Sequence, residues 1–264
     1  MNEHPGFLKS IERIVFQAGR IILETADRGI GTKKKSSNEL VTTADLASER
    51  FLREKLTALD PGAGFLGEES SEGTSPSPPF WVVDPLDGTN NFAHGFPVFA
   101  VSVAYRDVDS ISFACIHDPL RNETFSASKG GGAFLNGTAI HCTNRTSLSE
   151  CLVATGFPYR RGPGNPGVDF SVLAYFLERV QGLRRAGSAA LDLAYVACGR
   201  LDCFYEESLK PWDMAAGILL VREAGGRVTA YEGGEWTMAS RGVAASGKHI
   251  HDALRKGVES SLKK

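Results

Sequence analysis

Apolar residues recur at helical spacing near the amino terminus, on one face that comprises Leu8, Ile11, Val15, Ala18 and Ile22. This spacing predicts an amphipathic helix over residues 6–28. The next stretch, GTKKKSSNEL at residues 31–40, is rich in lysine and serine and has few apolar anchors. It is typical of a mobile loop. Thr42 or Thr43 can cap a second helix that runs from about Asp45 to Leu59.

The middle of the chain changes to a pattern of period two. Apolar and polar residues alternate between Phe99 and Phe134, in the segments VFAVSVAYRD, ISFACIHD, ETFSASKG and GAFLNG. Alternation of this kind predicts half-buried strands. The pair Asn136-Gly137 is a strong hairpin-turn signal. We therefore expect a meandering antiparallel sheet in this region.

After about residue 146, strand-like and helix-like segments alternate. Strands are expected at residues 151–157, 202–205, 227–230 and 242–245, and helices at residues 170–180, 189–198, 214–223 and 251–262. Such alternation is typical of α/β proteins. The chain has no internal repeat and no long linker. We expect one compact unit, with an α+β half over residues 1–145 that carries most candidate metal ligands and an α/β half over residues 146–264.

The segment WVVDPLDGTNNF, at residues 81–92, places two carboxylates three residues apart. Its apolar start predicts a short buried strand that ends at Asp84, because the following proline biases this residue towards extended backbone. A turn through the next two residues can bring Asp84 and Asp87 to one side. Gly88 has no Cβ, so a ligand can approach its amide closely. Paired acids beside free amides suit a divalent metal that holds an anionic group, and the alternative is a solvated turn.

Two further acids stand at comparable positions. Glu68, in FLGEES, follows the end of an apolar run as Asp84 does. Asp213, in KPWDMAAG, falls in the first turn of a predicted helix, where the helix dipole favours an acid. Position alone is also compatible with a simple helix cap at Asp213.

Composition narrows the classes of function. The 264 residues are 42% hydrophobic and 23% charged, as in ordinary globular proteins. A formal net charge of -2 gives no global attraction for nucleic acid or anionic membrane. No apolar run approaches the ~20 residues that span a bilayer. Five cysteines without a CxxC pair indicate a reducing compartment, and they argue against a disulfide framework or structural zinc. We expect a cytoplasmic protein.

Several segments together resemble the inositol monophosphatase family of Mg-dependent, lithium-sensitive sugar-phosphate phosphatases, and especially its bacterial branch. These segments are VTTAD (41–45), GEES (67–70), DPLDGTNNF (84–92), RRAGSAALDLAYVACGRLD (184–202) and WDMAAGILLVREAGG (212–226). They occur in order and span most of the chain, so the resemblance is global. It implies a layered α-β-α-β-α sandwich of mixed α+β and α/β character, and a homodimer.

The resemblance implies a two-magnesium site. One ion would be held by Glu68, Asp84 and the carbonyl oxygen of Leu86. Asp84 would bridge to a second ion, whose other ligands would be Asp87 and Asp213. Carboxylate oxygens with several retained waters are what Mg²⁺ prefers. One ion would lower the pKa of the attacking water, and the other would stabilise the departing alkoxide oxygen.

The family roles also extend to residues around Thr89. By this resemblance Thr89, oriented by Asp45, would help Glu68 to deprotonate the attacking water. The backbone amides of Gly88 and Thr89 would bind phosphate oxygens at the start of a helix.

Recognition of the leaving alcohol is implied for a second group of residues. Glu206 lies seven residues before Asp213 and matches the family position that bonds inositol hydroxyls. The segment Gly187, Ser188 and Ala189 matches the one that lines the sugar, and Asp87 can accept from a hydroxyl while it binds metal. Without a ligand, Glu206 would be a strand-end acid. Arg184 and Arg185 stay open between a subunit interface and an ion pair.

Charge counting favours additional positive charge at the site. The four carboxylates sum to -4, two Mg²⁺ ions balance them, and a phosphate monoester then adds about -2. A third Mg²⁺ or the lysines at 33–35 could supply the difference, and the alternative for the lysines is a solvated loop. The family has a lysine near Lys35, but the loop is one residue shorter here.

We therefore expect Mg-dependent hydrolysis of myo-inositol monophosphate to inositol and phosphate. One alternative keeps the mechanism and changes the substrate to fructose 1,6-bisphosphate, 3′-phosphoadenosine 5′-phosphate or histidinol phosphate, which relatives hydrolyse. Another is a regulatory or binding protein on the same scaffold, since fold alone does not fix function. The mark of that alternative would be a broken set of acids, and here the set is intact.

Overall fold

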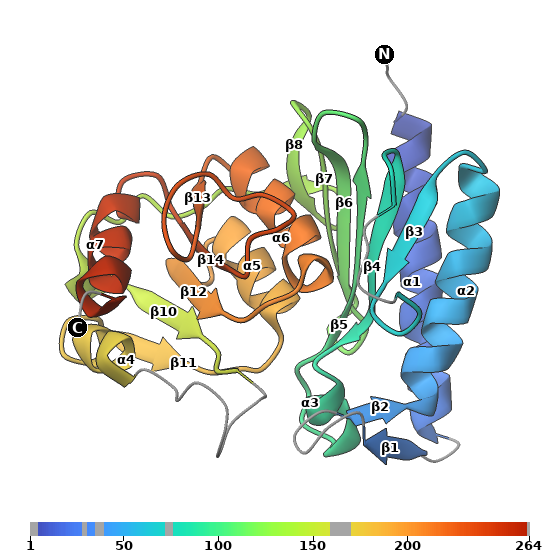
Figure 1. Cartoon of the computed structure of the whole chain (residues 1–264), viewed down its shortest axis with the longest axis horizontal. Helices are drawn as coiled ribbons and strands as arrows, with labels where there is room; N and C mark the ends of the chain where they lie inside the picture. Colours follow the sequence, from blue (N-terminus) through green and yellow to red (C-terminus); the bar gives the residue numbers. More distant parts are fainter. Residues whose placement is uncertain (1–4, 28–30, 35–39, 72–75, 159–169, 263–264) are drawn as a thin grey trace.

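A computed structural model describes residues 5–27, 31–34, 40–71, 76–158 and 170–262. These residues form five layers in the order α-β-α-β-α (Figure 1). The helical layers are α1 (Pro5–Asp27) with α2 (Thr43–Leu59) on one outside, α5 (Ala189–Ala197) with α6 (Pro211–Glu223) in the middle, and α4 (Phe170–Leu177) with α7 (His251–Leu262) on the other outside. The expected layered sandwich is confirmed.

The first sheet has seven strands in the order β3-β4-β5-β6-β7-β8-β9. They are β3 (Gly64–Gly67), β4 (Phe80–Asp87), β5 (Ala100–Arg106), β6 (Ile111–Asp118), β7 (Glu123–Ser128), β8 (Gly132–Leu135) and β9 (Thr138–Ala139). Strands β3 and β4 are parallel, and every later pair is antiparallel. The expected meander is therefore present from β5 onwards.

The second sheet has five strands in the order β11-β10-β12-β14-β13. They are β10 (Leu152–Thr155), β11 (Gly182–Arg184), β12 (Cys203–Glu207), β13 (Arg227–Ala230) and β14 (Gly242–Ser246). Strand β10 is parallel to β11 and β12, while β14 is antiparallel to its two neighbours. A short 3-10 helix, Leu148–Glu150, precedes β10.

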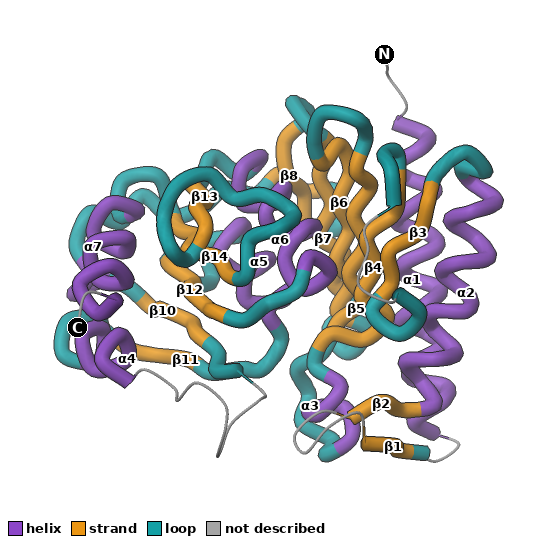
Figure 2. The backbone as a smooth tube through the Cα atoms, viewed as in Figure 1, coloured by secondary structure: helices purple, strands orange, loops and turns teal. Residues whose placement is uncertain are grey.

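The prediction of a mobile loop over residues 31–40 is wrong at both ends, where the structure has short strands. Strands β1 (Thr32–Lys34) and β2 (Leu40–Thr42) pair antiparallel, with Thr32 opposite Thr42. The hairpin lies beside the short helix α3 (Thr89–Ala93), as the backbone trace in Figure 2 shows. Tertiary pairing explains the difference, because Thr42 caps α2 and the Thr43 amide donates to the Gly31 carbonyl oxygen at 2.9 Å. Residues 35–39, including Lys35, lie outside the described residues, as do residue 28 of the first expected helix and residues 72–75.

The middle helical layer is apolar on all sides because it is buried between the two sheets. Helix α6 buries every residue from Met214 to Val221. Gly217 lies so close to α5 that a Cβ built on it would be 2.4 Å from the Cβ of Leu193. This close helix contact fixes the amino-terminal end of α6, which carries Asp213.

Replacing Gly217 by alanine is expected to lower the free energy of unfolding by about 1–3 kcal/mol, because the added methyl group overpacks the contact with Leu193. Gly6→Ala is the matched control, since Gly6 lies in α1 with open space where a Cβ would stand. It should leave stability unchanged or raise it by up to ~1 kcal/mol. Urea unfolding of both variants measures the difference. Equal stability of the two would contradict this account of the contact between α5 and α6.

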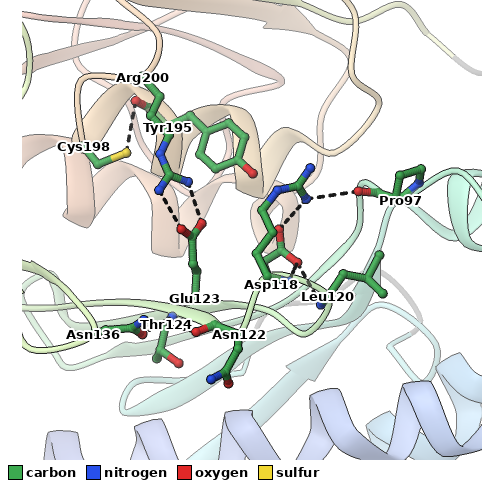
Figure 3. Close-up of polar contacts among 11 residues, drawn as sticks. Pro97, Asp118, Leu120, Asn122, Glu123, Thr124, Asn136, Tyr195, Cys198 and Arg200 are labelled. Carbon is green, nitrogen blue, oxygen red and sulfur yellow. Dashed lines mark hydrogen bonds and ion pairs between the residues drawn. The ribbon is translucent and has the colours of Figure 1, made fainter.

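A charged contact joins the middle layer to the first sheet. Both guanidinium Nη atoms of Arg200, which follows α5, donate to the carboxylate of Glu123 on β7, at 2.5 and 2.6 Å (Figure 3). A second arginine, Arg121, donates to Asp118 at 2.8 Å and to the Pro97 carbonyl oxygen at 3.1 Å. The pair of Arg200 with Glu123 anchors the carboxyl-terminal end of α5 on the sheet that carries the acids of the 81–92 segment, and Arg121 joins the end of β6 to the segment before β5.

Candidate active site

Strand β4 does not end at Asp84 as expected; it continues to Asp87 through a β-bulge. Asp84 lies opposite Ser102 and Asp87 opposite Ala100, so two residues of β4 oppose one residue of β5 between these pairs. Pro85 occupies the bulge, where its missing N–H disrupts no regular ladder bond. In a regular strand, residues three apart point to opposite faces. The extra residue offsets this alternation and lets both aspartates face the same cavity.

Glu68 reaches the same place through the parallel pairing of β3 with β4. Gly67 at the end of β3 lies opposite Val83, and the Glu68 amide donates to the Val83 carbonyl oxygen at 3.1 Å. Because parallel strands end at the same edge of a sheet, Glu68 emerges beside Asp84. Glu68 thus follows the end of its strand as expected, whereas Asp84 lies beside it within a strand that continues.

Asp213 comes from the other side of the cavity, in the first turn of α6. Its Oδ2 accepts the Lys210 amide proton at 2.7 Å, so Asp213 does cap the helix. It also lines the cavity with Glu68 and the two β4 aspartates. Asp213 can therefore cap the helix and bind a metal at the same time, although the sequence alone leaves these roles as alternatives.

A hydrogen-bond network connects Thr89 with the start of α2. The hydroxyl oxygen of Thr89 lies 2.8 Å from Oδ1 of Asp45 and 2.9 Å from the Leu86 carbonyl oxygen. The other oxygen of Asp45 accepts from the Thr42 amide at 2.7 Å and from the Thr42 hydroxyl at 2.5 Å. Asp45 is fully buried, so the capping box of α2 holds it rigidly behind Thr89.

One cavity of about 640 Å³, including its open mouth, collects most of the predicted site residues. Ten of the twelve line it, namely Glu68, Asp84, Leu86, Asp87, Gly88, Thr89, Gly187, Ala189, Glu206 and Asp213. The other two contact lining residues directly. Asp45 is bonded to Thr89, and the Ser188 hydroxyl donates to Oδ2 of Asp87 at 2.5 Å. The structure therefore brings all twelve together.

Gly88 occupies a position that requires glycine. Its φ is +92°, in the left-handed region, and a Cβ would lie 2.8 Å from the Val98 carbonyl oxygen. It precedes α3, and the first amides of a helix have no partner within the helix. The backbone at Gly88 and Thr89 can thus present N–H groups to an anion in the cavity.

The acids raise the pKa of one another in this enclosed space. Burial raises the pKa of Asp84 well above its usual range, and the charges of Glu68, Asp87 and Asp213 raise it further. Burial likewise raises the pKa of Asp213, with Glu68 and Asp87 adding to the effect. The pKa of Asp87 rises to about 6, because burial outweighs the hydrogen bonds from Ser188 and Ala190. A cation at this place would relieve the repulsion.

The donor set fits a hard divalent cation. It consists of carboxylate oxygens and a carbonyl oxygen, which are the ligands Mg²⁺ prefers, and histidine and cysteine are absent from the described lining. In this conformation, no group of three histidine, cysteine or acidic side chains among the described residues is close enough together to hold an ion. Two ions held by these acids would draw the side chains closer to one another.

The raised pKa values predict how the stability of metal-free protein depends on pH. A carboxyl whose folded pKa exceeds its unfolded value stabilises the fold at low pH, and this contribution is lost as pH rises through the folded pKa. For Asp87 the window runs from about 4 to about 6. Thermal melting in EDTA should therefore give a Tm that falls between about pH 4 and pH 6, and Asp87→Asn should flatten the fall. A Tm that rises over this interval in wild type and variant alike would contradict the prediction.

Some lining residues were not predicted from the sequence. They are Leu40, Asn90, Gly156, Arg185 and Leu209. Arg185 stood out in the sequence only as one of two adjacent arginines, and no local pattern indicates that its side chain reaches the cavity. The buried Asp192 was also missed, because its position in α5 looks like an ordinary first-turn acid. Lys33 is exposed on β1.

Comparison with known proteins decides the family. The model of the inositol monophosphatase family matches residues 7–263. The chain belongs to the inositol monophosphatase family. Membership in this family, which is generally metal-dependent, identifies the chain as an enzyme of the inositol-phosphate phosphatase class.

Similar proteins cover nearly the whole chain. The inositol-1-monophosphatase of Rhizobium meliloti is 42% identical over 259 residues, which are 97% of each chain. The Nus factor SuhB of Pseudomonas aeruginosa is 39% identical over 95% of this chain and 94% of its own. The crystal structure of the extragenic suppressor protein suhB from Bartonella henselae has a TM-score of 0.88 at 38% identity, and covers 95% of this chain and 97% of that one.

Two general properties of this inositol monophosphatase family member follow from the structure. All five cysteines are free thiols. Within the described ranges, no helix combines the length and the apolar character needed to cross a bilayer.

Proposed function

We propose that this protein is a Mg-dependent phosphomonoesterase that hydrolyses myo-inositol monophosphate to inositol and phosphate. The observation that carries the proposal is the convergence of Glu68, Asp84, Asp87 and Asp213 on one cavity that also contains Glu206. The first four come from three separate parts of the chain, and their mutual repulsion calls for cations. The fifth lies where an alcohol can be recognised.

The metal ligands are assigned by the family resemblance, and the position of these acids around one cavity supports the assignment. Glu68, Asp84 and the Leu86 carbonyl oxygen would hold one Mg²⁺, and Asp84, Asp87 and Asp213 would hold another. When bound, Mg²⁺ lowers the pKa of a coordinated water and stabilises negative charge on phosphate and leaving-group oxygens. The Leu86 amide donates to Oδ1 of Asp84 at 3.0 Å, and the hydrogen bonds of Asp87 and Asp213 described above use Oδ2. A second oxygen of each aspartate can therefore face an ion.

The proton of the attacking water would pass towards Thr89 and Glu68. Asp45 holds the Thr89 side chain, and the Thr89 hydroxyl has two acceptors for its single proton, Asp45 and the Leu86 carbonyl oxygen. The Thr89 oxygen can accordingly accept a hydrogen bond from the water, and if it takes the proton, its own proton would pass to Oδ1 of Asp45. The amides of Gly88 and Thr89 would bind phosphate oxygens as phosphorus is attacked.

Recognition of the polyol would fall to the opposite side of the cavity. Burial raises the pKa of Glu206 well above its usual range, and the nearby Asp192 adds to the effect. Its carboxyl lies against Gly156, where any Cβ would be 2.1 Å from its oxygens. A carboxyl held this firmly can distinguish a correctly placed hydroxyl from its absence. Gly187 and Ala189 complete this wall, with Ser188 behind it on Asp87.

A phosphate-release panel with and without Mg²⁺ tests the proposal. We expect the highest kcat/KM for myo-inositol 1-phosphate, a strict requirement for Mg²⁺, and inhibition by lithium at millimolar concentration as in the family. The competitors are fructose 1,6-bisphosphate, 3′-phosphoadenosine 5′-phosphate and histidinol phosphate. A higher kcat/KM for any of these would replace the substrate but keep the mechanism, and turnover without Mg²⁺ would reject the mechanism.

Gel filtration tests the homodimer that we propose by family resemblance. A third Mg²⁺ would show as a cooperative dependence of the rate on Mg²⁺ concentration.

A second candidate function is suggested by the Nus factor name of the Pseudomonas aeruginosa relative. Under this candidate the chain binds a regulatory partner, with or without catalysis. Complementation of a strain that lacks that relative separates the two, using wild type and Asp84→Asn. Equal complementation by both would assign the regulatory role to binding alone.

A further inference from the structure

Arg185 is the one cation among the described residues that line the cavity. The other charged lining residues are Glu68, Asp84, Asp87, Glu206 and Asp213, which are all acids. Arg185 follows the edge strand β11 and precedes the Gly187–Ala189 wall of the cavity. A guanidinium in this position lies on the Gly187–Ala189 side of the cavity.

The guanidinium lies directly on Gly187. A Cβ built on Gly187 would be 2.7 Å from Nη1 of Arg185 and 3.1 Å from Nδ2 of Asn91. The φ of Gly187 is +87°, so both its conformation and its lack of a side chain admit the arginine. Arg185 Nη1 is thus placed between the turn at Gly187 and the interior of the cavity.

The backbone beneath Arg185 is tied to the metal side of the site. Nδ2 of Asn91, on α3, donates to the Ala186 carbonyl oxygen at 2.8 Å and to the Val98 carbonyl oxygen at 2.7 Å. Helix α3 begins directly after Asp87 and Gly88. The turn that carries Arg185 therefore has a fixed position relative to the phosphate-binding end of the cavity.

Arg185 is near the buried Asp192 and the half-buried Glu206, and it forms an ion pair with neither. Its positive charge opposes the upward shift of the pKa of Glu206 and of Asp192. Yet among the described residues no carboxylate lies within ion-pair distance of the guanidinium, whose charge acts on the two acids at longer range. The ion pair considered from the sequence is therefore absent among these residues, which leaves a ligand or a partner subunit to accept from the N–H donors of Arg185.

We propose that Arg185 determines specificity for the leaving alcohol, by donating hydrogen bonds to a polyol oxygen while Glu206 accepts from a neighbouring hydroxyl. The inference rests on the proposed function and names the substrate class more closely. A donor and an acceptor side by side match two vicinal hydroxyls, since each hydroxyl oxygen can accept and each O–H can donate. A phosphorylated alcohol without such hydroxyls would gain nothing from Arg185.

Three variants and three substrates test the proposal. Arg185→Gln removes the charge and most donors, and Arg185→Lys keeps the charge but loses the planar fork. Arg184→Gln is the matched control, because Arg184 is a neighbouring arginine that is equally exposed, bonds to the Leu183 carbonyl oxygen, and does not line the cavity. The substrates are myo-inositol 1-phosphate, p-nitrophenyl phosphate, which has no vicinal hydroxyls, and fructose 1,6-bisphosphate, which has a second anionic group.

We expect Arg185→Gln to raise KM for myo-inositol 1-phosphate about tenfold or more, as loss of charge-assisted hydrogen bonds does, with kcat nearly unchanged. Arg185→Lys should lie between this variant and wild type. For p-nitrophenyl phosphate, kcat/KM should stay within about twofold of wild type, which also shows that the metal site is folded. Arg184→Gln should match wild type on every substrate.

Three results would overturn the proposal. They are wild-type kinetics of Arg185→Gln on inositol phosphate, an equal loss on inositol phosphate and p-nitrophenyl phosphate, and a loss confined to fructose bisphosphate. The last result would mean that Arg185 binds a second anionic group of the substrate. In each case the wild-type activity still stands. Absence of phosphate release from inositol phosphate by wild type would instead reject the proposed function.

Discussion

Replacement of Asp84 by asparagine is expected to lower kcat/KM for Mg-dependent phosphate release by at least about a thousandfold, or ~4 kcal/mol. Asp84 is the proposed bridge between two ions, so its loss removes a ligand from both. The same change should raise the Tm of the metal-free protein. Asp84 is 1% exposed and lies among three other acids, and a neutral amide of equal size relieves this repulsion.

The opposite signs of these two effects make the experiment decisive. A variant that merely unfolds loses activity and stability together, whereas the two-metal account requires lost activity with gained stability in EDTA. Mg²⁺ should raise the Tm of wild type but not of Asp84→Asn. Asp109→Asn, in an exposed loop, is the control and should behave as wild type. Near wild-type turnover by Asp84→Asn would reject the assignment of this residue as a metal bridge.

Replacement of Thr89 by alanine is expected to lower kcat about a hundredfold, within the range for loss of a proton-transfer group. The reason is that Asp45 and the Leu86 carbonyl oxygen both hold the Thr89 hydroxyl at hydrogen-bond distance, which leaves the oxygen oriented to take a proton from water. KM should change little, because the amides of Gly88 and residue 89 remain. Steady-state kinetics with myo-inositol 1-phosphate gives both quantities.

Thr89→Ser is the matched control, since it keeps the hydroxyl and removes only a methyl group. It should retain activity within about tenfold of wild type. If Thr89→Ala and Thr89→Ser lose activity equally, the hydroxyl has no part in proton transfer and the effect comes from packing. Asp45→Asn should resemble Thr89→Ala, because an amide in place of Oδ1 changes the acceptor that orients the hydroxyl.

The sequence predicts elements whose pattern is local, and it fails where the backbone depends on distant partners. Helix α7 and strand β13 begin and end where expected, because their periodicity and turn residues are contained in the segment. The bulge in β4 could not be predicted, since it exists only through pairing with β5. The hairpin of β1 and β2 likewise needs the contacts of Gly31 and Thr42 with the start of α2.

The candidate site shows the same division. Acids recognisable by their motifs converge as expected, because short strands and helix starts place them at one edge. Arg185 lies in no local sequence pattern that predicts a role in the site. Its role depends on Gly187 and Asn91, which bring the end of β11 against α3 across almost a hundred residues of sequence. Only the folded chain reveals that juxtaposition.

The most direct test of the two-metal account is a crystal structure of the protein soaked in Mn²⁺, with an anomalous difference map. Manganese takes the same oxygen ligands as magnesium and is visible in such a map. The account predicts two peaks in the cavity, one between Glu68 and Asp84 and one among Asp84, Asp87 and Asp213, with these side chains drawn closer together. A map with no peak at these carboxylates, or with its peaks elsewhere, would contradict it.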